Sequence, residues 1–313
     1  MQGIGWDDKL FVGLGLAAAV STALVAARHR DRRRYRPGSG DRSDLPTAPV
    51  VYRLRLAHLR AGRDDPDPDA DGESDPDRPD GRPRRVPTPP VVLRATDTTA
   101  DDQASVLFIG VRDGREIALD LACAHGLGLL GTGAAAAVRA LLVAAMTATP
   151  ATAHRVARVV VPAEDLVALL GRRAAQTPLP AGLQVTDDLD TALNVLEADT
   201  LVRLGRPPAT AQVWQPVVLV ARTPARQSRR LQAILDNGSA VGVTGLLLGQ
   251  WTSGVTAYVR DDGTVSATSP GIGEPLRGTR VFRLGDDHTA DLLTLLHHAH
   301  PETEPDPRPP PAP

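Results

Sequence analysis

Apolar and polar positions alternate between two kinds of segment over the last two thirds of the chain. Short apolar runs bounded by glycine, proline or aspartate are typical of buried strands, and longer runs of strong helix formers are typical of helices. Two pairs of apolar runs flank Asp-Gly dipeptides at 113–114 and 262–263, which predicts hairpins. The other predicted strands lie at 126–130, 157–161, 183–186, 216–221, 241–249 and 279–285.

Predicted helices separate most of these strands. They lie at 134–149, after Pro162, up to Gly205, up to Gly238 and over the final segment HTADLLTLLHHAH. Strand–helix alternation of this kind indicates an α/β domain, with a mostly parallel sheet and helices on both faces. The run PVVLVA is apolar at every position, as expected of a strand whose two faces are both covered. We assign this domain to residues 91–300, and we expect no folded structure in the proline-rich tail at 301–313.

The N-terminal pattern is different. Residues 10–27 carry no charge, and arginines follow at once in the segment RHRDRRRYR. An apolar run of this length approaches the thickness of a bilayer, and the basic flank favours the cytoplasmic side. The pattern therefore predicts one transmembrane helix in the cell membrane, a short extracytoplasmic tail at 1–9, and a cytoplasmic location for everything that follows.

Residues 28–90 read as a linker, first basic and then rich in aspartate and proline. Such a composition buries too little apolar surface to offset the entropy of ordering, so we expect this linker to be disordered. Within it, VVYRLRLAHLR at 50–60 alternates apolar residues with arginine. This piece fits either an additional edge strand or an amphipathic segment on a membrane.

The composition argues against several kinds of binding site and catalytic site. The formal net charge of −2 gives no reason to expect direct nucleic-acid binding. Cys123 is the only cysteine, which excludes an internal disulfide or a multi-cysteine metal site. His297, His298 and His300 cluster near the C-terminus without a carboxylate or cysteine to complete a ligand set. No nucleophile–base motif occurs, so we predict no catalytic residue, no metal and no cofactor.

The segment GLGLLGTGAAAAVRALL predicts a strand, a glycine turn and a helix, an arrangement that nucleotide-binding proteins use to hold phosphate. A P-loop anchored on Gly131 would need Gly, Lys and Ser or Thr at three later positions. Ala136, Ala137 and Val138 stand there instead. The only lysine in the chain is Lys9, far from the turn.

A dinucleotide turn, G-x-G-x-x-G/A, is the second template. Gly131, Gly133 and Ala136 match it and are the candidate cofactor-binding residues. That motif also needs an acidic residue about 20 positions on, and Glu164 and Asp165 come too late. Three interpretations stay open: a turn required only for tight packing, weak or partner-dependent nucleotide binding, and dinucleotide binding.

The order of elements after the turn resembles the motor domain of FtsK/HerA-type ATPases, including those of type VII secretion. The resemblance covers 105–285 and includes RLQAILDNGSAVGVTGLLLGQW, where Gln250 holds the place of the sensor glutamine. Ala221, Arg222 and Thr223 stand where the family carries its metal-organising acidic pair. The layout is also similar to the middle region of actinobacterial membrane proteins that carry a bacterial transcriptional activator domain.

The resemblance implies a degenerate P-loop domain, a pseudo-ATPase rather than a motor. We therefore expect a membrane-anchored regulatory or scaffold protein that is not an enzyme. Its expected partners are the membrane and another protein, such as an active ATPase or a regulator. The alternative is a nucleotide- or dinucleotide-binding sensor that uses the turn at 131–136.

Overall fold

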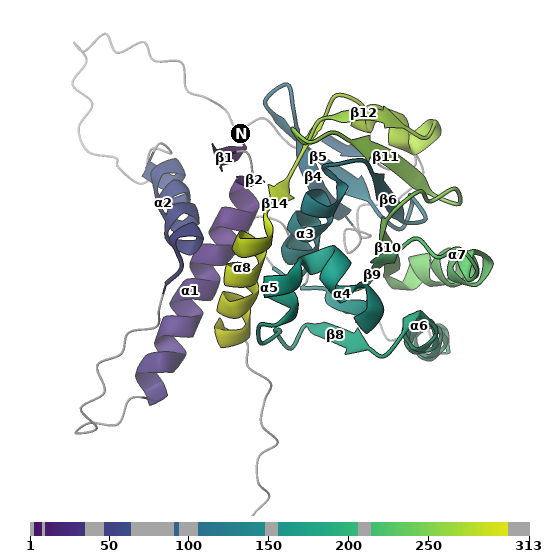
Figure 1. Ribbon diagram of the computed structural model, residues 1–313, viewed down its shortest axis with the longest axis horizontal. Coiled ribbons are helices and arrows are strands. Elements are labelled where there is room, and N and C mark those ends of the chain that lie inside the picture. Colours follow the sequence, from purple (N-terminus) through teal and green to yellow (C-terminus); the bar gives the residue numbers. More distant parts are fainter. Residues whose placement is uncertain are drawn as a thin grey trace, which may run out of the picture.

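The computed structural model describes residues 3–7, 10–34, 47–63, 91–93, 106–147, 156–205 and 214–299 (Figure 1). Within these ranges, seven strands form the central sheet in the order β12-β11-β6-β10-β9-β7-β8, and all neighbours are parallel except β11 and β12. The strands are β6 (Leu127–Leu130), β7 (Arg158–Pro162), β8 (Leu183–Thr186), β9 (Val217–Arg222), β10 (Val243–Leu248), β11 (Val255–Val259) and β12 (Val265–Thr268).

Helices cover both faces of this sheet (Figure 1). On one face lie α3 (Ala134–Ala145) and α4 (Ala163–Leu170), with α5 (Arg172–Ala175) and α8 (Asp286–Ala299) outside them. On the other lie α6 (Leu189–Leu204) and α7 (Ser228–Gly238). Strand β9 alternates between the two cores: Leu219 packs on the α6–α7 side and Val220 on the α3 side. The predicted mostly parallel sheet with helices on both faces is confirmed.

The strand order places the glycine turn at a defined edge. Strand β6 lies between β10 and β11, whereas β7, the next strand in the sequence, lies beyond β10 and β9. Because these strands are parallel, the carboxyl ends of β6, β7, β9 and β10 meet at one edge of the sheet. Ligands of open α/β sheets bind at such an edge, so a ligand of this domain would contact the residues there.

A second sheet contains the predicted hairpin. Strands β4 (Val106–Arg112) and β5 (Arg115–Asp120) pair antiparallel, with β13 (Arg280–Val281) and β3 (Val91–Leu93) on their outer edges. Asp113 and Gly114 both have positive φ, 52° and 74°, as a two-residue hairpin turn with the right twist requires. Two short 3₁₀ helices, η2 (Ser239–Val241) and η3 (Gly271–Leu276), complete the connections.

The N-terminal segment differs from its prediction. Residues expected to open a transmembrane helix form β2 (Leu10–Val12), which pairs with β1 (Ile4–Asp7) and β14 (Arg283–Leu284). Helix α1 (Leu14–Arg34) begins only after Gly13 and packs against α8 through buried side chains such as Val20 and Leu24. The boundaries predicted at 10–27 are therefore wrong, because the pairing with β14 uses the first apolar residues.

Among the residues that the structure describes, no helix combines the length and apolar character needed to cross a membrane.

The linker prediction also needs correction. Residues 28–34 continue α1, and Pro49–Arg63 form helix α2, which packs against α1 and α8. Val50, Val51 and Leu54 are buried in that contact. The segment at 50–60 is thus a helix and not an edge strand, because its apolar residues recur at helical spacing. The acidic stretch at 64–90 and the tail at 300–313 lie outside the described residues.

Glu116 joins α1 to the second sheet and makes stability depend on pH. Its carboxylate accepts a hydrogen bond from the backbone of Leu14, at the first turn of α1. Burial raises the pKa of Glu116 above its ordinary 4.5, although the hydrogen bond from the Leu14 amide opposes that shift. A raised pKa means that the folded state binds the proton more tightly, so this contribution to stability is complete below pH 4.5 and is lost as the pH rises through the folded pKa.

We therefore expect Glu116→Gln to raise the melting temperature at pH 7 and to leave it nearly unchanged near pH 4.5. Thermal unfolding across that pH range measures the difference. Glu274→Gln, at an exposed acid, is the matched control and should show no such trend. A wild-type-minus-variant difference that is independent of pH would contradict this assignment.

Candidate functional site at the glycine turn

The turn between β6 and α3 is short. It consists of residues 131–133, and Gly131 has a φ of +96°, a conformation that favours glycine. The amide of Ala134 donates to the Gly131 carbonyl at 3.2 Å, and that of Ala137 donates to the Gly133 carbonyl at 3.0 Å. The chain therefore passes from strand to helix without the longer phosphate-surrounding loop of a P-loop.

Both glycines allow strand β11 to approach. The amide of Gly133 donates to the Val259 carbonyl at 3.2 Å. A Cβ atom at Gly131 would lie 2.3 Å from that carbonyl oxygen, and one at Gly133 would lie 2.0 Å from the carbonyl oxygen of Arg260. These distances are too short for any side chain. The geometry thus gives the two glycines a packing role that needs no ligand.

The positions that a P-loop would use for phosphate and magnesium point into the core. Ala137 and Val138 are fully buried, and both pack in the main hydrophobic cluster. Ala136, the third candidate cofactor-binding residue, is partly exposed in the first turn of α3. Lys9 lies outside the described residues.

A polar cleft of about 870 Å³ opens at the N-terminus of α3. Ala135 and Ala136 line it, and their amides have no hydrogen-bond partner within the described part of the chain. The other lining residues come from the turn, α4, α5, the β11–β12 turn and the start of α8, and the charged ones are Arg139, Arg172, Arg173, Asp261, Arg283, Asp286 and Asp287.

Acidic residues hold two of the four arginines in this cleft. Arg139 donates to the Leu284 carbonyl at 2.9 Å and pairs with Asp286 at 3.0 Å. Burial lowers the pKa of the Arg139 guanidinium, and Asp286 partly restores it. Arg173 pairs with Asp287 at 3.1 Å and with Asp291 at 2.9 Å. The cleft is therefore nearly balanced in charge.

Two polar atoms beside this cleft have no partner among the described residues: the buried Nε of Arg283 and Nδ1 of His288. Arg283 also donates through its Nη1 to the Asp261 carbonyl. Arg172 is exposed and forms no ion pair within the described ranges. The cleft can accept an anionic or polar ligand, because it presents helix amides and the guanidiniums of Arg172 and Arg283, neither of which pairs with a carboxylate among the described residues.

The carboxyl edge of the sheet holds an ion pair in place of an acidic pair. Strand β9 ends at Arg222, whose guanidinium pairs with Asp165 in the first turn of α4. The Arg222 backbone amide donates to the same carboxylate at 2.8 Å. The hydrogen bond to Asp165 raises the pKa of Arg222. Asp165 is buried and Gln250 is exposed nearby, so this edge offers a metal ion no free carboxylate pair from β9.

The sequence indicated only that Asp165 comes too late for a dinucleotide site, and it did not reveal Arg222 as its partner. The available signal was an acidic residue after one predicted strand and an arginine at the end of another. Only the three-dimensional order, in which β7 and β9 are neighbours, brings them together.

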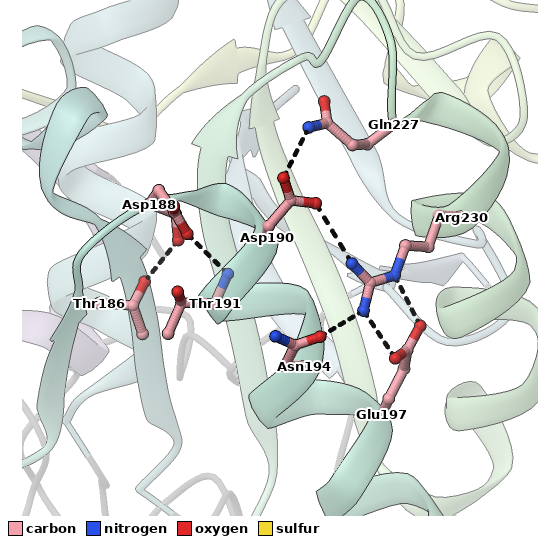
Figure 2. Close-up of polar contacts among 8 residues, drawn as sticks. All are labelled: Thr186, Asp188, Asp190, Thr191, Asn194, Glu197, Gln227 and Arg230. Carbon is pink, nitrogen blue, oxygen red and sulfur yellow. Dashed lines mark hydrogen bonds and ion pairs between the residues drawn. The ribbon is translucent and has the colours of Figure 1, made fainter.

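Helices α6 and α7 are joined by a polar cluster on the other face (Figure 2). Asp188 caps α6 by accepting from the Thr191 amide at 2.7 Å. Arg230 of α7 contacts Glu197 at 2.8 and 2.7 Å, and it also contacts Asn194 and Asp190 (Figure 2). These contacts hold the two helices together and involve no catalytic arrangement.

The histidines do not assemble a metal site in the described ranges. His297 contacts the Leu179 carbonyl through Nδ1 at 2.9 Å, and its ring meets His298 edge-on. Throughout the part of the chain with described structure, no three His, Cys, Asp or Glu side chains are placed to hold a metal ion. His300 falls outside that part.

No protein-family model and no curated protein matches the chain. Solved structures show distant similarity. ATPases 2 and 3 of EssC from Geobacillus thermodenitrificans match with 14% identity and a TM-score of 0.38, over 68% of this chain and 51% of that chain. The pCW3 conjugation coupling protein TcpA, solved with ATPγS, matches with 13% identity and a TM-score of 0.39, over 66% of this chain and 75% of that chain.

ATPases 2 and 3 of EccC from Thermomonospora curvata, in complex with a signal sequence peptide, match with 14% identity and a TM-score of 0.36, over 56% of this chain and 38% of that chain. The chain thus spans about half of the matched EssC structure. These similarities to secretion and conjugation ATPases are distant, and they give this chain neither a family nor an activity.

Proposed function

We propose that this chain is a non-catalytic RecA-like domain that serves as a regulatory or scaffold module for a protein partner. The observation that carries the proposal is that the glycine turn packs tightly against strand β11 and lacks the side chains that bind phosphate in a P-loop. The positions aligned with the P-loop lysine and hydroxyl are Ala137 and Val138, and both are fully buried. Transfer of a phosphoryl group depends on charge stabilisation that these side chains do not supply.

Nearby groups are poor substitutes for the missing ones. Arg139 is the basic residue nearest to the first turn of α3, and it is held by Asp286 and the Leu284 carbonyl. At the end of β9, Arg222 occupies the place of the metal-organising acids and neutralises Asp165. A nucleotide bound over the turn would therefore meet no P-loop lysine and, at the end of β9, no carboxylate pair for magnesium, although Arg172, which forms no ion pair among the described residues, lines the same cleft.

The proposal predicts no hydrolysis of nucleotide. Phosphate release from ATP or GTP with magnesium should stay at the level of a protein-free blank for the full chain. The control is Arg139→Ala, which should release phosphate no more slowly than the wild type. Turnover that exceeds the blank and falls in Arg139→Ala would show that Arg139 has taken over the role of the lysine, and the proposal would fail.

A protein partner is supported by apolar exposure on α6. Leu201, Val202 and Leu204 are 70%, 56% and 54% exposed near the end of this helix. Such a patch is typical of a contact surface. A partner captured by the wild type and by Val167→Ser, but lost with Leu201→Ser/Leu204→Ser, would support the proposal. If Leu201→Ser/Leu204→Ser still captured every partner, the contact would lie elsewhere on the chain.

The cleft at α3 favours one alternative function, a sensor that binds a nucleotide or another anion. Its free Ala135 and Ala136 amides and the exposed Arg172 are the supporting observations. Ala136→Asp tests it, since an acidic residue in the first turn suits the helix dipole but repels an anion. If the sensor hypothesis holds, Ala136→Asp weakens calorimetric binding of ATP, ADP, NAD or NADP roughly tenfold or more. Ala233→Asp on α7 is the control and leaves that binding unchanged.

A further inference from the structure

Helices α1 and α2 lie side by side, on the far side of α8 from the central sheet (Figure 1). Their inner side chains are fixed: Leu24 of α1 and Val51 and Leu54 of α2 are buried. These contacts fix the orientation of the two helices and so determine which of their side chains remain exposed.

The exposed positions of these two helices carry apolar side chains next to arginines. Tyr52 and Leu59 of α2 are 62% and 51% exposed, and they share one helix face because seven residues make nearly two turns. Exposed Arg53 and Arg60 follow them directly. Val25 of α1 is 58% exposed, and exposed Arg28 lies one turn further on. We call these six residues the α1–α2 surface.

Charge is strongly concentrated on the same two helices. The sequence at 28–34 and 49–63 contains nine arginines and one acidic residue, Asp31, although the whole chain has a formal net charge of −2. Within the described residues, none of the arginines at positions 28, 30, 53, 55 and 60 forms an ion pair. By contrast, Arg139 and Arg173 of the α3 cleft and Arg230 of α7 are each held by carboxylates.

We propose that the α1–α2 surface binds the face of an anionic lipid bilayer. The uncompensated arginines are complementary to acidic head groups, each contributing to attraction at the bilayer surface. Tyr52, Leu59 and Val25 would enter the interfacial region, where aromatic and aliphatic side chains of surface-bound helices lie. Nucleic acid would use the arginines but leave these apolar side chains in water, so lipid is the better match to the whole surface.

Vesicle co-sedimentation of the full chain tests this inference. The chain should sediment with vesicles of equal parts phosphatidylcholine and phosphatidylglycerol, and not with vesicles of phosphatidylcholine alone. Arg53→Gln/Arg60→Gln should weaken the binding roughly 30-fold. Tyr52→Ser/Leu59→Ser should weaken it about tenfold or more, because apolar burial in the interface is lost.

The control is Arg226→Gln/Arg229→Gln, which removes the same charge from exposed positions at α7 and should bind like the wild type. All variants change exposed side chains, and their melting temperatures verify that the fold is kept. If the control variant bound the vesicles equally weakly, net charge alone would explain the effect and the inference would be overturned. Binding of double-stranded DNA that survives Tyr52→Ser/Leu59→Ser and exceeds the binding of anionic vesicles would also overturn it.

Discussion

Gly133→Ala is expected to lower the free energy of unfolding by at least about 3 kcal/mol. The added Cβ would lie 2.0 Å from the Arg260 carbonyl oxygen and 2.9 Å from Cγ1 of Val259. Backbone on both sides resists movement, because Gly133 also donates a hydrogen bond to Val259. The φ of Gly133 is −85°, so the cost is steric and not conformational. Urea unfolding monitored by circular dichroism measures it.

Gly182→Ala is the matched control for this prediction. A Cβ there would meet only the Ala157 carbonyl oxygen, at 3.8 Å, and the change should cost less than about 1 kcal/mol. If Gly133→Ala were as mild as the control, strand β11 would not press against the turn. The packing explanation of the glycines would then be wrong, and a ligand would be needed to explain them.

Asp165→Ala is expected to cost about 2–3 kcal/mol of stability. The buried carboxylate accepts from both the guanidinium and the backbone amide of Arg222, so its removal leaves that amide without its acceptor. Arg222→Ala should cost less, about 1 kcal/mol, because the guanidinium is half exposed and the carboxylate keeps the amide bond. This asymmetry distinguishes an anchored carboxylate from a simple surface ion pair.

Glu164→Ala is the neighbouring control for Asp165. Glu164 is exposed in the same turn of α4, and its removal should cost within about 0.5 kcal/mol. Chemical denaturation of the three variants gives the comparison. Equal losses for Asp165→Ala and Arg222→Ala would contradict the assigned geometry, and a negligible loss for Asp165→Ala would leave the carboxyl edge free for other chemistry.

Local signals predicted the central fold well. The Asp-Gly turn at 113–114 and the helix end at Gly238 each depend on a few adjacent residues, and the structure has both features. The apolar run at 216–221 predicted a strand with both faces covered, and β9 occupies it with a shift of one residue. Short-range chemistry of this kind is contained within a segment, which is why sequence alone reveals it.

The N-terminal part shows what local pattern leaves undecided. A helix that is apolar on all sides fits a membrane or a protein interior equally well. Burial of Val20 and Leu24 against other helices depends on α8, some 270 residues later in the sequence. Likewise, the sequence of residues 10–12 contains no signal that these residues pair with β14.

Only those features of the candidate site that depend on adjacent residues were predicted from the sequence. Gly131, Gly133 and Ala136 do lie at a strand-to-helix turn beside a cleft. The sequence could not show that β11 fills the space next to the two glycines, nor that Arg222 meets Asp165. Both facts depend on the order of the strands in the sheet. That order brings together residues that are far apart in the sequence, so no single segment reveals it.

Calorimetric titration of the full chain with ATP, with and without magnesium, tests the central claim most directly. The account predicts no heat of specific binding that depends on magnesium, because Ala137 and Val138 stand at the P-loop lysine and hydroxyl positions and β9 ends at Arg222 without an acidic pair. Magnesium-dependent binding that is lost in a variant of the β9 end, such as Thr223→Ala, would contradict it. The domain would then hold nucleotide at the carboxyl edge of its sheet, and the non-catalytic scaffold would have to be abandoned.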